Sequence, residues 1–135
     1  RGLCNDLGFT NEDRAENIRR IGEVSALMMD AGLIVIAAFI SPFRRDRRIV
    51  RKLVADRDFI EIYCNTPLDI CEMRDAKGLY KKARSGKLSE FTGITSPYEI
   101  PKNPEIILNS GELNVEKCVE QIINYLVDNN YFSSI

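Results

Sequence analysis

The feature that most constrains the fold is an uninterrupted apolar run, Leu33–Ile40, that follows a segment with helical spacing. Such a run, without polar alternation, is typical of a strand covered on both faces, and it is far too short to span a bilayer. Apolar residues recur at helical intervals from Thr10 to Ala31, where Thr10 and Asp13 are placed like a capping pair and Gly32 like a helix stop. The sequence therefore predicts a helix that leads into a buried strand.

The same alternation continues through the rest of the chain. The spacing of apolar residues predicts helices over Arg47–Ala55, Pro67–Arg74 and Asn114–Asp128, and strands over Phe59–Cys64 and Glu105–Leu108. Because strands alternate with helices, the predicted fold class is α/β with a parallel sheet. Three strands make a small sheet of this kind, so we expect the domain to continue upstream of Arg1.

Composition excludes several classes of function. The 135 residues are 44% hydrophobic, enough for one domain with one core, and 19 Lys and Arg against 20 Asp and Glu give a net charge of −1. This balance argues against bulk attraction to nucleic acid or to an anionic membrane. Four scattered cysteines, with no C-x-x-C pair and no histidine, favour reduced thiols over zinc sites or disulfides. We therefore expect a soluble cytoplasmic protein with no zinc site, and no metal ligand is predicted among residues 1–135.

The segment between the last two predicted strands is the least typical of ordinary packing. Met73–Pro101 interleaves lysines and arginines with Tyr80, Phe91 and Tyr98, and glycines interrupt it. One interpretation is a solvated helix and loop. The other is a mobile lid over the carboxyl ends of the strands, whose cations neutralise phosphate and whose aromatic rings stack on a base. The pattern favours the lid.

Four stretches, in order, carry a resemblance to a known family: LGFTNEDRAENIRRIGEV, AFISPFR, TPLDICEMRDAKGLYKKAR and FTGITSPYE. Together they resemble the adenylylsulfate kinases, which phosphorylate the 3′-hydroxyl of adenylyl sulfate. The resemblance implies a three-layer P-loop NTPase fold with a parallel sheet. It also implies that about residues 74–101 form a lid, that ATP is the co-substrate and that Mg²⁺ is the cofactor.

The family also carries a phosphate-binding loop, G-x-x-x-x-G-K-[ST], which residues 1–135 do not contain. We expect this loop, its helix and two strands to precede Arg1, so that residues 1–135 form a kinase domain incomplete at its amino terminus. If the molecule has no such segment, the resemblance implies a protein without kinase activity.

The resemblance implies a set of residues that bind adenylyl sulfate: Phe9, Arg14, Asn17, Ile40, Ser41, Lys77, Gly78, Leu79 and Phe91. Phe9 and Phe91 are expected on opposite faces of the adenine, and Arg14 with Asn17 at the phosphosulfate and nucleotide portions. By pattern alone, Phe9 is a hydrophobic staple before the helix and Arg14 is a solvated cation.

The resemblance implies a catalytic role for Ser41 and Lys77. The family serine at Ser41 is described as a phosphoserine intermediate, but in-line transfer between two bound substrates needs none, so we expect Ser41 to bind. Lys77 is expected to contact the substrate phosphate or the transferring group.

ATP is expected to contact Arg74, Leu113 and Val115, with the Arg74 guanidinium against its adenine. The alternative for Arg74 is a cation that meets the dipole at a helix end. In the lid, Thr95 stands where the family usually has Asp, which leaves open how that turn is ordered.

Two other functions remain open from the sequence. One is a degenerate nucleotide-binding or regulatory module without catalysis, and the other is a nucleic-acid-binding domain suggested by the basic, aromatic lid. We expect no nucleic-acid or membrane partner and a homodimer, while fusion to or association with ATP sulfurylase stays open. Most of the arginine cluster that follows Pro42 is expected to be the solvated start of a helix, and Arg44 could reach an anionic ligand: Arg44, Arg45, Arg47 and Arg48.

Overall fold

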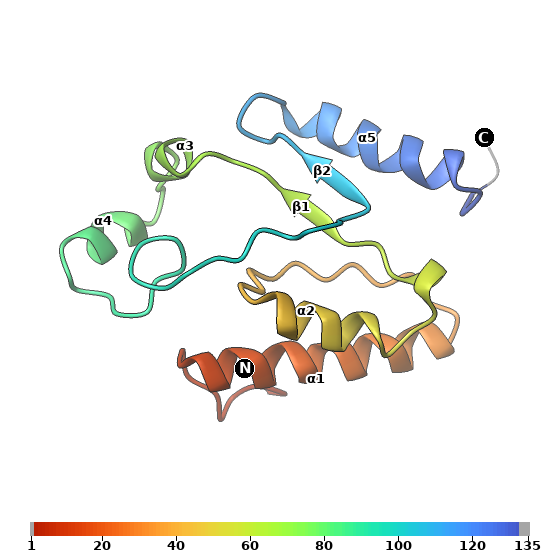
Figure 1. The fold of residues 1–135 in the computed structure, drawn as a ribbon, viewed down its shortest axis with the longest axis horizontal. Helices are drawn as coiled ribbons and strands as arrows, with labels where there is room; N and C mark the ends of the chain where they lie inside the picture. Colours follow the sequence, from red (N-terminus) through yellow and green to blue (C-terminus); the bar gives the residue numbers. More distant parts are fainter. Residues whose placement is uncertain (1, 133–135) are drawn as a thin grey trace. The chain divides into compact units, whose positions relative to one another are not determined.

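The computed structural model describes residues 2–132, which form two compact units. The first unit contains residues 2–59 and 83–100, and the second contains residues 60–82 and 101–132. Figure 1 shows the elements in chain order: α1 Asn11–Asp30, α2 Arg44–Arg51, a 3₁₀ turn at Asp56–Asp58, β1 Ile62–Cys64, α3 Leu68–Met73, α4 Leu79–Arg84, β2 Ile106–Leu108 and α5 Val115–Asp128. No helix within residues 2–132 has the length and apolar character needed to cross a membrane.

Local signals set both ends of α1. The Thr10 side chain accepts a hydrogen bond from the backbone N–H of Asp13 at 3.1 Å, which satisfies one of the free donors at the start of the helix. At the other end Ala31 is the C-cap, and Gly32 adopts a φ of +83°, a left-handed conformation that glycine accepts without strain. The predicted helix and its capping residue are confirmed.

The prediction of a strand at Leu33–Ile40 is wrong within the described residues, 2–132. This segment is irregular and pairs with no strand in the described chain, and Ile34 and Ile36 are 77% and 92% exposed. A strand is stable only when its N–H and C=O groups pair with a neighbour, and the apolar pattern contains no information about that neighbour. Within the described residues, neither the predicted pairing nor the predicted burial of this segment is found.

β1 and β2 form a parallel two-stranded ladder in the second unit. Ile62, Tyr63 and Cys64 pair with Ile106, Ile107 and Leu108 in that order. Ile106 and Leu108 are 7% and 5% exposed, whereas Ile107 between them is 53% exposed, as expected when successive side chains point to opposite faces. The parallel direction is confirmed, and both strands are shorter than predicted.

The helices of the second unit begin and end close to the predicted residues. Pro67 caps α3, Arg74 follows its last turn, and the Asn114 side chain caps α5 by accepting from Lys117 N at 2.9 Å. α5 packs on β2. The loop between β2 and α5 contains Leu113, a predicted ATP-contact residue, and Val115, another, is the first residue of α5.

In the first unit α1 packs against α2 at Gly22. A Cβ atom at this buried position would lie 2.9 Å from Val50 Cγ2 and from Leu53 Cδ1. Because a β-branched valine has little freedom to move, the close approach of the two helices depends on the missing side chain.

Gly22→Ala is therefore expected to lower the free energy of unfolding. Overpacking costs about 1–3 kcal/mol, and the better helix propensity of alanine offsets about 1 kcal/mol, which leaves a net loss of about 1 kcal/mol. Urea denaturation measures it. Glu23→Ala, at the exposed neighbour, is the matched control and should change stability by less than about 0.5 kcal/mol. A stabilised Gly22→Ala variant would contradict the proposed close packing.

Candidate functional site

Arg14 is the centre of the first group of predicted site residues. It lies in the first turn of α1, and its guanidinium donates Nε–H to the Phe9 carbonyl at 3.0 Å. Its Nη1 donates to Thr92 Oγ1 at 2.7 Å and its Nη2 to the Glu90 carbonyl. One side chain thus joins the segment before α1 to the loop that contains Phe91, about 78 residues later.

This geometry corrects the interpretation of Arg14 as a solvated cation. Three of its five N–H donors are used within the protein, so the guanidinium is fixed rather than mobile. The remaining donors can still bind an oxyanion. A planar fork held in this way offers a defined position for phosphate or sulfate, because little rotamer freedom is left to lose on binding.

Phe9 and Phe91 lie in the two segments that Arg14 joins. Phe9 is 80% exposed and Phe91 is half-buried. An apolar ring exposed to this extent at the start of a helix is available for a ligand, since it is not used in packing within the unit. Asn17, one helical turn after Arg14, accepts a long hydrogen bond from the Cys4 thiol at 3.6 Å.

The turn after Phe91 is closed by Thr95. The Phe91 N–H donates to Thr95 Oγ1 at 2.9 Å, and the Phe91 carbonyl accepts from the N–H groups of Ile94, Thr95 and Ser96. Gly93 has a φ of +87° in the middle of the turn. The threonine hydroxyl therefore supplies an acceptor at the position where the resemblance led us to expect a carboxylate.

Thr95→Ala should speed hydrogen exchange at the Phe91 amide by about fivefold, because one hydrogen bond worth about 1 kcal/mol is lost. Thr95→Ser keeps the hydroxyl and is the matched control, and Thr95→Asp should also keep the protection. Exchange rates by NMR would measure this, and equal rates in all three variants would show that the hydroxyl does not order the turn.

Ile40 and Ser41 form a corner before α2. Ile40 is 63% exposed, and Ser41 is half-buried with a φ of +36°, which is unusual for a residue other than glycine. The Ser41 carbonyl accepts a hydrogen bond from Arg47. This contact involves the backbone of Ser41, and the binding role of the residue stays a prediction.

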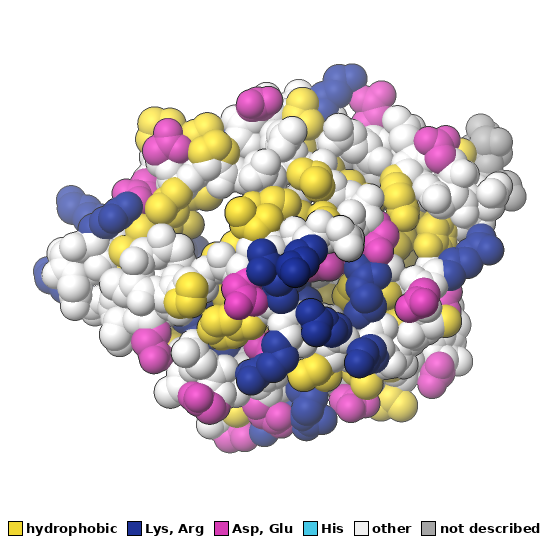
Figure 2. Space-filling model, in the orientation of Figure 1, with side chains coloured by type: hydrophobic (Ala, Val, Ile, Leu, Met, Phe, Trp, Pro, Cys, Tyr) yellow, Lys and Arg dark blue, Asp and Glu magenta, His cyan; other side chains and the backbone are white. Residues whose placement is uncertain are grey.

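The arginines after Pro42 divide into two kinds. Arg45 and Arg48 are exposed, and Figure 2 shows dark blue side chains gathered where α2 lies in Figure 1. Arg47, in contrast, is only 9% exposed, so the expectation of a solvated cation is wrong for this residue. α2 also begins at Arg44 rather than Arg47, because the Glu99 carboxylate accepts from the Arg44 N–H at 2.7 Å.

In the second unit, Arg74 lies against the turn after β2. Its Nη1 donates to the Ser110 carbonyl at 2.8 Å and its Nη2 to the Gly111 carbonyl at 3.4 Å. Leu113, half-buried, and Val115, 73% exposed, follow this turn. The structure therefore brings Arg74 to the loop that leads to Leu113 and Val115, in an exposed position where the guanidinium can meet a base.

Lys77, Gly78 and Leu79 lie between α3 and α4. Lys77 is exposed, Gly78 has a φ of +64°, and Leu79 is the first residue of α4. The Asp75 carboxylate accepts from the N–H groups of Leu79 at 2.8 Å and Lys81 at 3.1 Å. Asp75 thereby holds the turn that presents Lys77.

Charged groups beside the site are held by hydrogen bonds. Hydrogen bonds from Arg19 and Arg20 lower the pKa of Glu16 to about 2, and the hydrogen bond from Arg20 lowers the pKa of Asp6. Arg20 also donates to the Leu3 carbonyl at 2.8 Å, so it fastens the segment before Phe9 to α1. Burial raises the pKa of the Tyr80 hydroxyl, with further contributions from Cys71 and nearby carboxylates.

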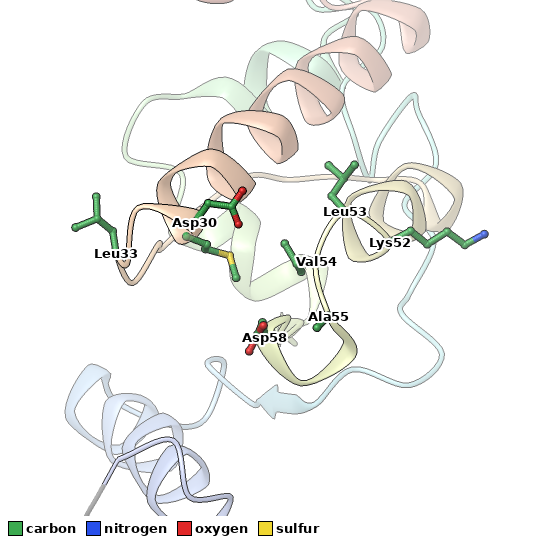
Figure 3. Close-up of a pocket in the computed structure, with 8 residues that line it drawn as sticks. Asp30, Leu33, Lys52, Leu53, Val54, Ala55 and Asp58 are labelled. Carbon is green, nitrogen blue, oxygen red and sulfur yellow. The ribbon is translucent and has the colours of Figure 1, made fainter.

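No group of three or more His, Cys, Asp or Glu within residues 2–132 is placed to hold a metal ion. A hollow of about 510 Å³ does open at the carboxyl ends of α1 and α2 (Figure 3). Met29, Asp30, Leu33, Lys52, Leu53, Val54, Ala55 and Asp58 line it, and none of the predicted site residues is among them.

Sequence reasoning missed the partners that hold the site. Thr92, Glu90 and Glu99 left no local signal, because each acts on a side chain or backbone group more than 50 residues away. Asp75 could have been found, since an aspartate shortly before a helix start is a typical capping residue.

A profile of the adenylylsulphate kinase family matches residues 1–109. The adenylyl-sulfate kinase of Prochlorococcus marinus is 59% identical over 129 residues, which are 96% of this chain and 64% of that protein. That of Acaryochloris marina is 63% identical over 125 residues, 93% of this chain and 61% of that protein. The chain thus spans somewhat less than two thirds of the length of these two relatives.

Solved structures show the same similarity. The APS kinase CysC of Mycobacterium tuberculosis, solved in complex with AMPPNP and APS, superposes with a TM-score of 0.87 at 46% identity, covering 93% of this chain and 73% of that one. A structure named APE1195 gives a TM-score of 0.81 at 38% identity, covering 94% of this chain and 72% of that one. These matches support an α/β fold of the P-loop kinase type.

Proposed function

Because this chain belongs to the adenylylsulfate kinase family, we propose that it takes part in transferring the γ-phosphoryl group of ATP to the 3′-hydroxyl of adenylyl sulfate. The observation that carries the proposal is the bridge by Arg14, which fixes a cation between the two segments that contain Phe9 and Phe91. The family resemblance assigns those two rings to one adenine, and the relative solved with AMPPNP and APS supports the substrate pair.

In the proposed complex the adenine of adenylyl sulfate stacks on Phe9 and Phe91. The free N–H groups of Arg14 bind an oxygen of the phosphosulfate, and the backbone at Ile40 and Ser41 contacts the base. The segment 74–101 acts as a lid, and closure brings the Lys77 ammonium to the phosphate region.

ATP occupies a separate part of the proposed site, where its adenine lies on the Arg74 guanidinium beside Leu113 and Val115. The 3′-oxygen of adenylyl sulfate attacks the γ-phosphorus, the bond from that phosphorus to the β–γ bridging oxygen breaks, and the hydroxyl proton is released. The products are 3′-phosphoadenylyl sulfate and ADP. Lys77 stabilises charge on the transferring group, which is the main work of the protein in such a reaction.

Mg²⁺ is implied by the family and would neutralise the phosphates of ATP. The described residues form no cluster that could hold it, so none of their proposed roles depends on the ion. A homodimer and a cytoplasmic location belong to the proposal as well. A relative from Thiobacillus denitrificans, 28% identical with a TM-score of 0.67, is described as hexameric. Sedimentation of the full-length protein would give its own oligomeric state.

The direct test supplies γ-labelled ATP and adenylyl sulfate to the full-length protein. Labelled 3′-phosphoadenylyl sulfate should appear together with ADP, and no label should transfer when adenylyl sulfate is omitted. Saturating substrates without transfer would refute the kinase activity. If both nucleotides bound under those conditions, the degenerate nucleotide-binding module would be the better description.

A further inference from the structure

We propose that Arg47 is a positioning residue that fixes the Ser41 corner and joins it to the end of the lid. The inference rests on the proposed function for its effect on substrate, but its structural basis is independent of it. Arg47 has no assigned role in the reaction, and it lies on α2, where Arg45 and Arg48 are exposed and Arg44 and Arg51 are half-buried.

The contacts of Arg47 reach two segments that are far apart in the sequence. Its Nη1 donates to the Ser41 carbonyl, and its Nη2 donates to the Glu99 carbonyl at 2.6 Å. The guanidinium also lies over the Tyr98 ring, 5.7 Å from the ring centroid. A buried, planar cation with its donors divided between two carbonyls sets the distance between them.

The Ser41 corner needs such support. A φ of +36° is a sparsely populated conformation for serine, and it persists only where the surroundings hold it. The hydrogen bond from Arg47 acts on the carbonyl of that same residue. Arg47 therefore controls the backbone that the proposed function places against the adenine, without itself touching the substrate.

Neighbouring contacts tie the same two segments together. The Glu99 N–H donates to the Pro42 carbonyl at 2.9 Å, and Arg44 Nε donates to the Ile100 carbonyl at 2.7 Å. Glu99 in turn caps the start of α2 through the Arg44 N–H. The segment 98–100 is thereby fastened to the corner by several contacts besides those of Arg47.

The test compares Arg47→Lys with Arg48→Lys in the full-length protein. Lysine keeps the charge but cannot divide a fork between two carbonyls, so Arg47→Lys should raise KM for adenylyl sulfate by about tenfold, with KM for ATP changed less than about twofold. Arg48→Lys alters an exposed neighbour on the same helix and should change neither value.

Hydrogen exchange supplies a second measurement that needs no catalysis. The Glu99 amide, which donates to Pro42, should exchange faster in Arg47→Lys than in Arg48→Lys. If the wild-type protein does not phosphorylate adenylyl sulfate, the proposed function fails, and the exchange result still decides whether Arg47 holds the corner.

Tyr98→Leu covers the case in which Arg47→Lys does not fold. It removes only the aromatic face from the guanidinium and should raise KM for adenylyl sulfate by about threefold. Unchanged exchange at Glu99 in both variants, or equal changes in KM for the two substrates, would overturn the inference.

Discussion

Replacing Arg14 with alanine is expected to lower kcat/KM for adenylyl sulfate by at least about a hundredfold, because hydrogen bonds from a charged donor contribute about 1.5–3 kcal/mol each. The variant loses the bridge to Phe9 and to the loop at Glu90–Thr92, and it also loses the proposed contact with the phosphosulfate. Steady-state kinetics with adenylyl sulfate varied at saturating ATP would measure the effect.

Two further variants distinguish the loss of the Arg14 bridge from a general loss of protein stability. Arg14→Lys keeps a positive charge without the fork and should lose about tenfold. Arg19→Ala, on the same helix, removes an exposed arginine paired with Glu16 and should leave kcat/KM unchanged. If Arg14→Ala raised KM for adenylyl sulfate and for ATP equally, a specific role of Arg14 in binding adenylyl sulfate would be contradicted.

Phe91→Ala is expected to weaken binding of adenylyl sulfate by about tenfold to a hundredfold, since stacking of a base on an aromatic ring contributes about 1–3 kcal/mol. ATP should be affected by less than about twofold, because its proposed contacts are Arg74, Leu113 and Val115. Isothermal titration of each nucleotide would give both dissociation constants.

The matched control for Phe91→Ala is Phe132→Ala, which removes an aromatic ring, 41% exposed, outside the proposed site. Phe91→Leu keeps apolar area without the π face and should give an intermediate loss. Equal losses for adenylyl sulfate and ATP in Phe91→Ala would exclude the proposed stacking of one adenine by Phe9 and Phe91.

The parts of the fold that were predicted correctly are those with local signals. α1 has its capping threonine within three residues of the helix start and its glycine directly after the end, so both ends can be read from neighbouring residues. The start of α2 depends on Glu99, 55 residues away in the sequence, and the prediction accordingly missed it.

The same distinction applies to the candidate site. Residue types at Phe9, Arg14 and Arg74 could be selected from the sequence through the family resemblance. Their partners could not, since two of the three acceptors for Arg14 lie 76 and 78 residues away, and Arg74 donates to backbone carbonyls, which carry no side-chain signature. Arg47 was expected in solvent because arginine usually is, and its burial follows from carbonyls that only the folded chain brings together.

The parallel ladder also has a consequence for synthesis of the protein. Ile62 pairs with Ile106, so β1 leaves the ribosome well before its partner exists. Bacterial and eukaryotic ribosomes add about 5–20 residues per second, and the wait for the second strand is therefore roughly 2–9 s. During that interval α1 and α2, whose contacts are closer in sequence, can already pack, while the edge of β1 is open to chaperones or to a wrong strand. The nascent chain is most vulnerable to aggregation in the seconds between these two strands.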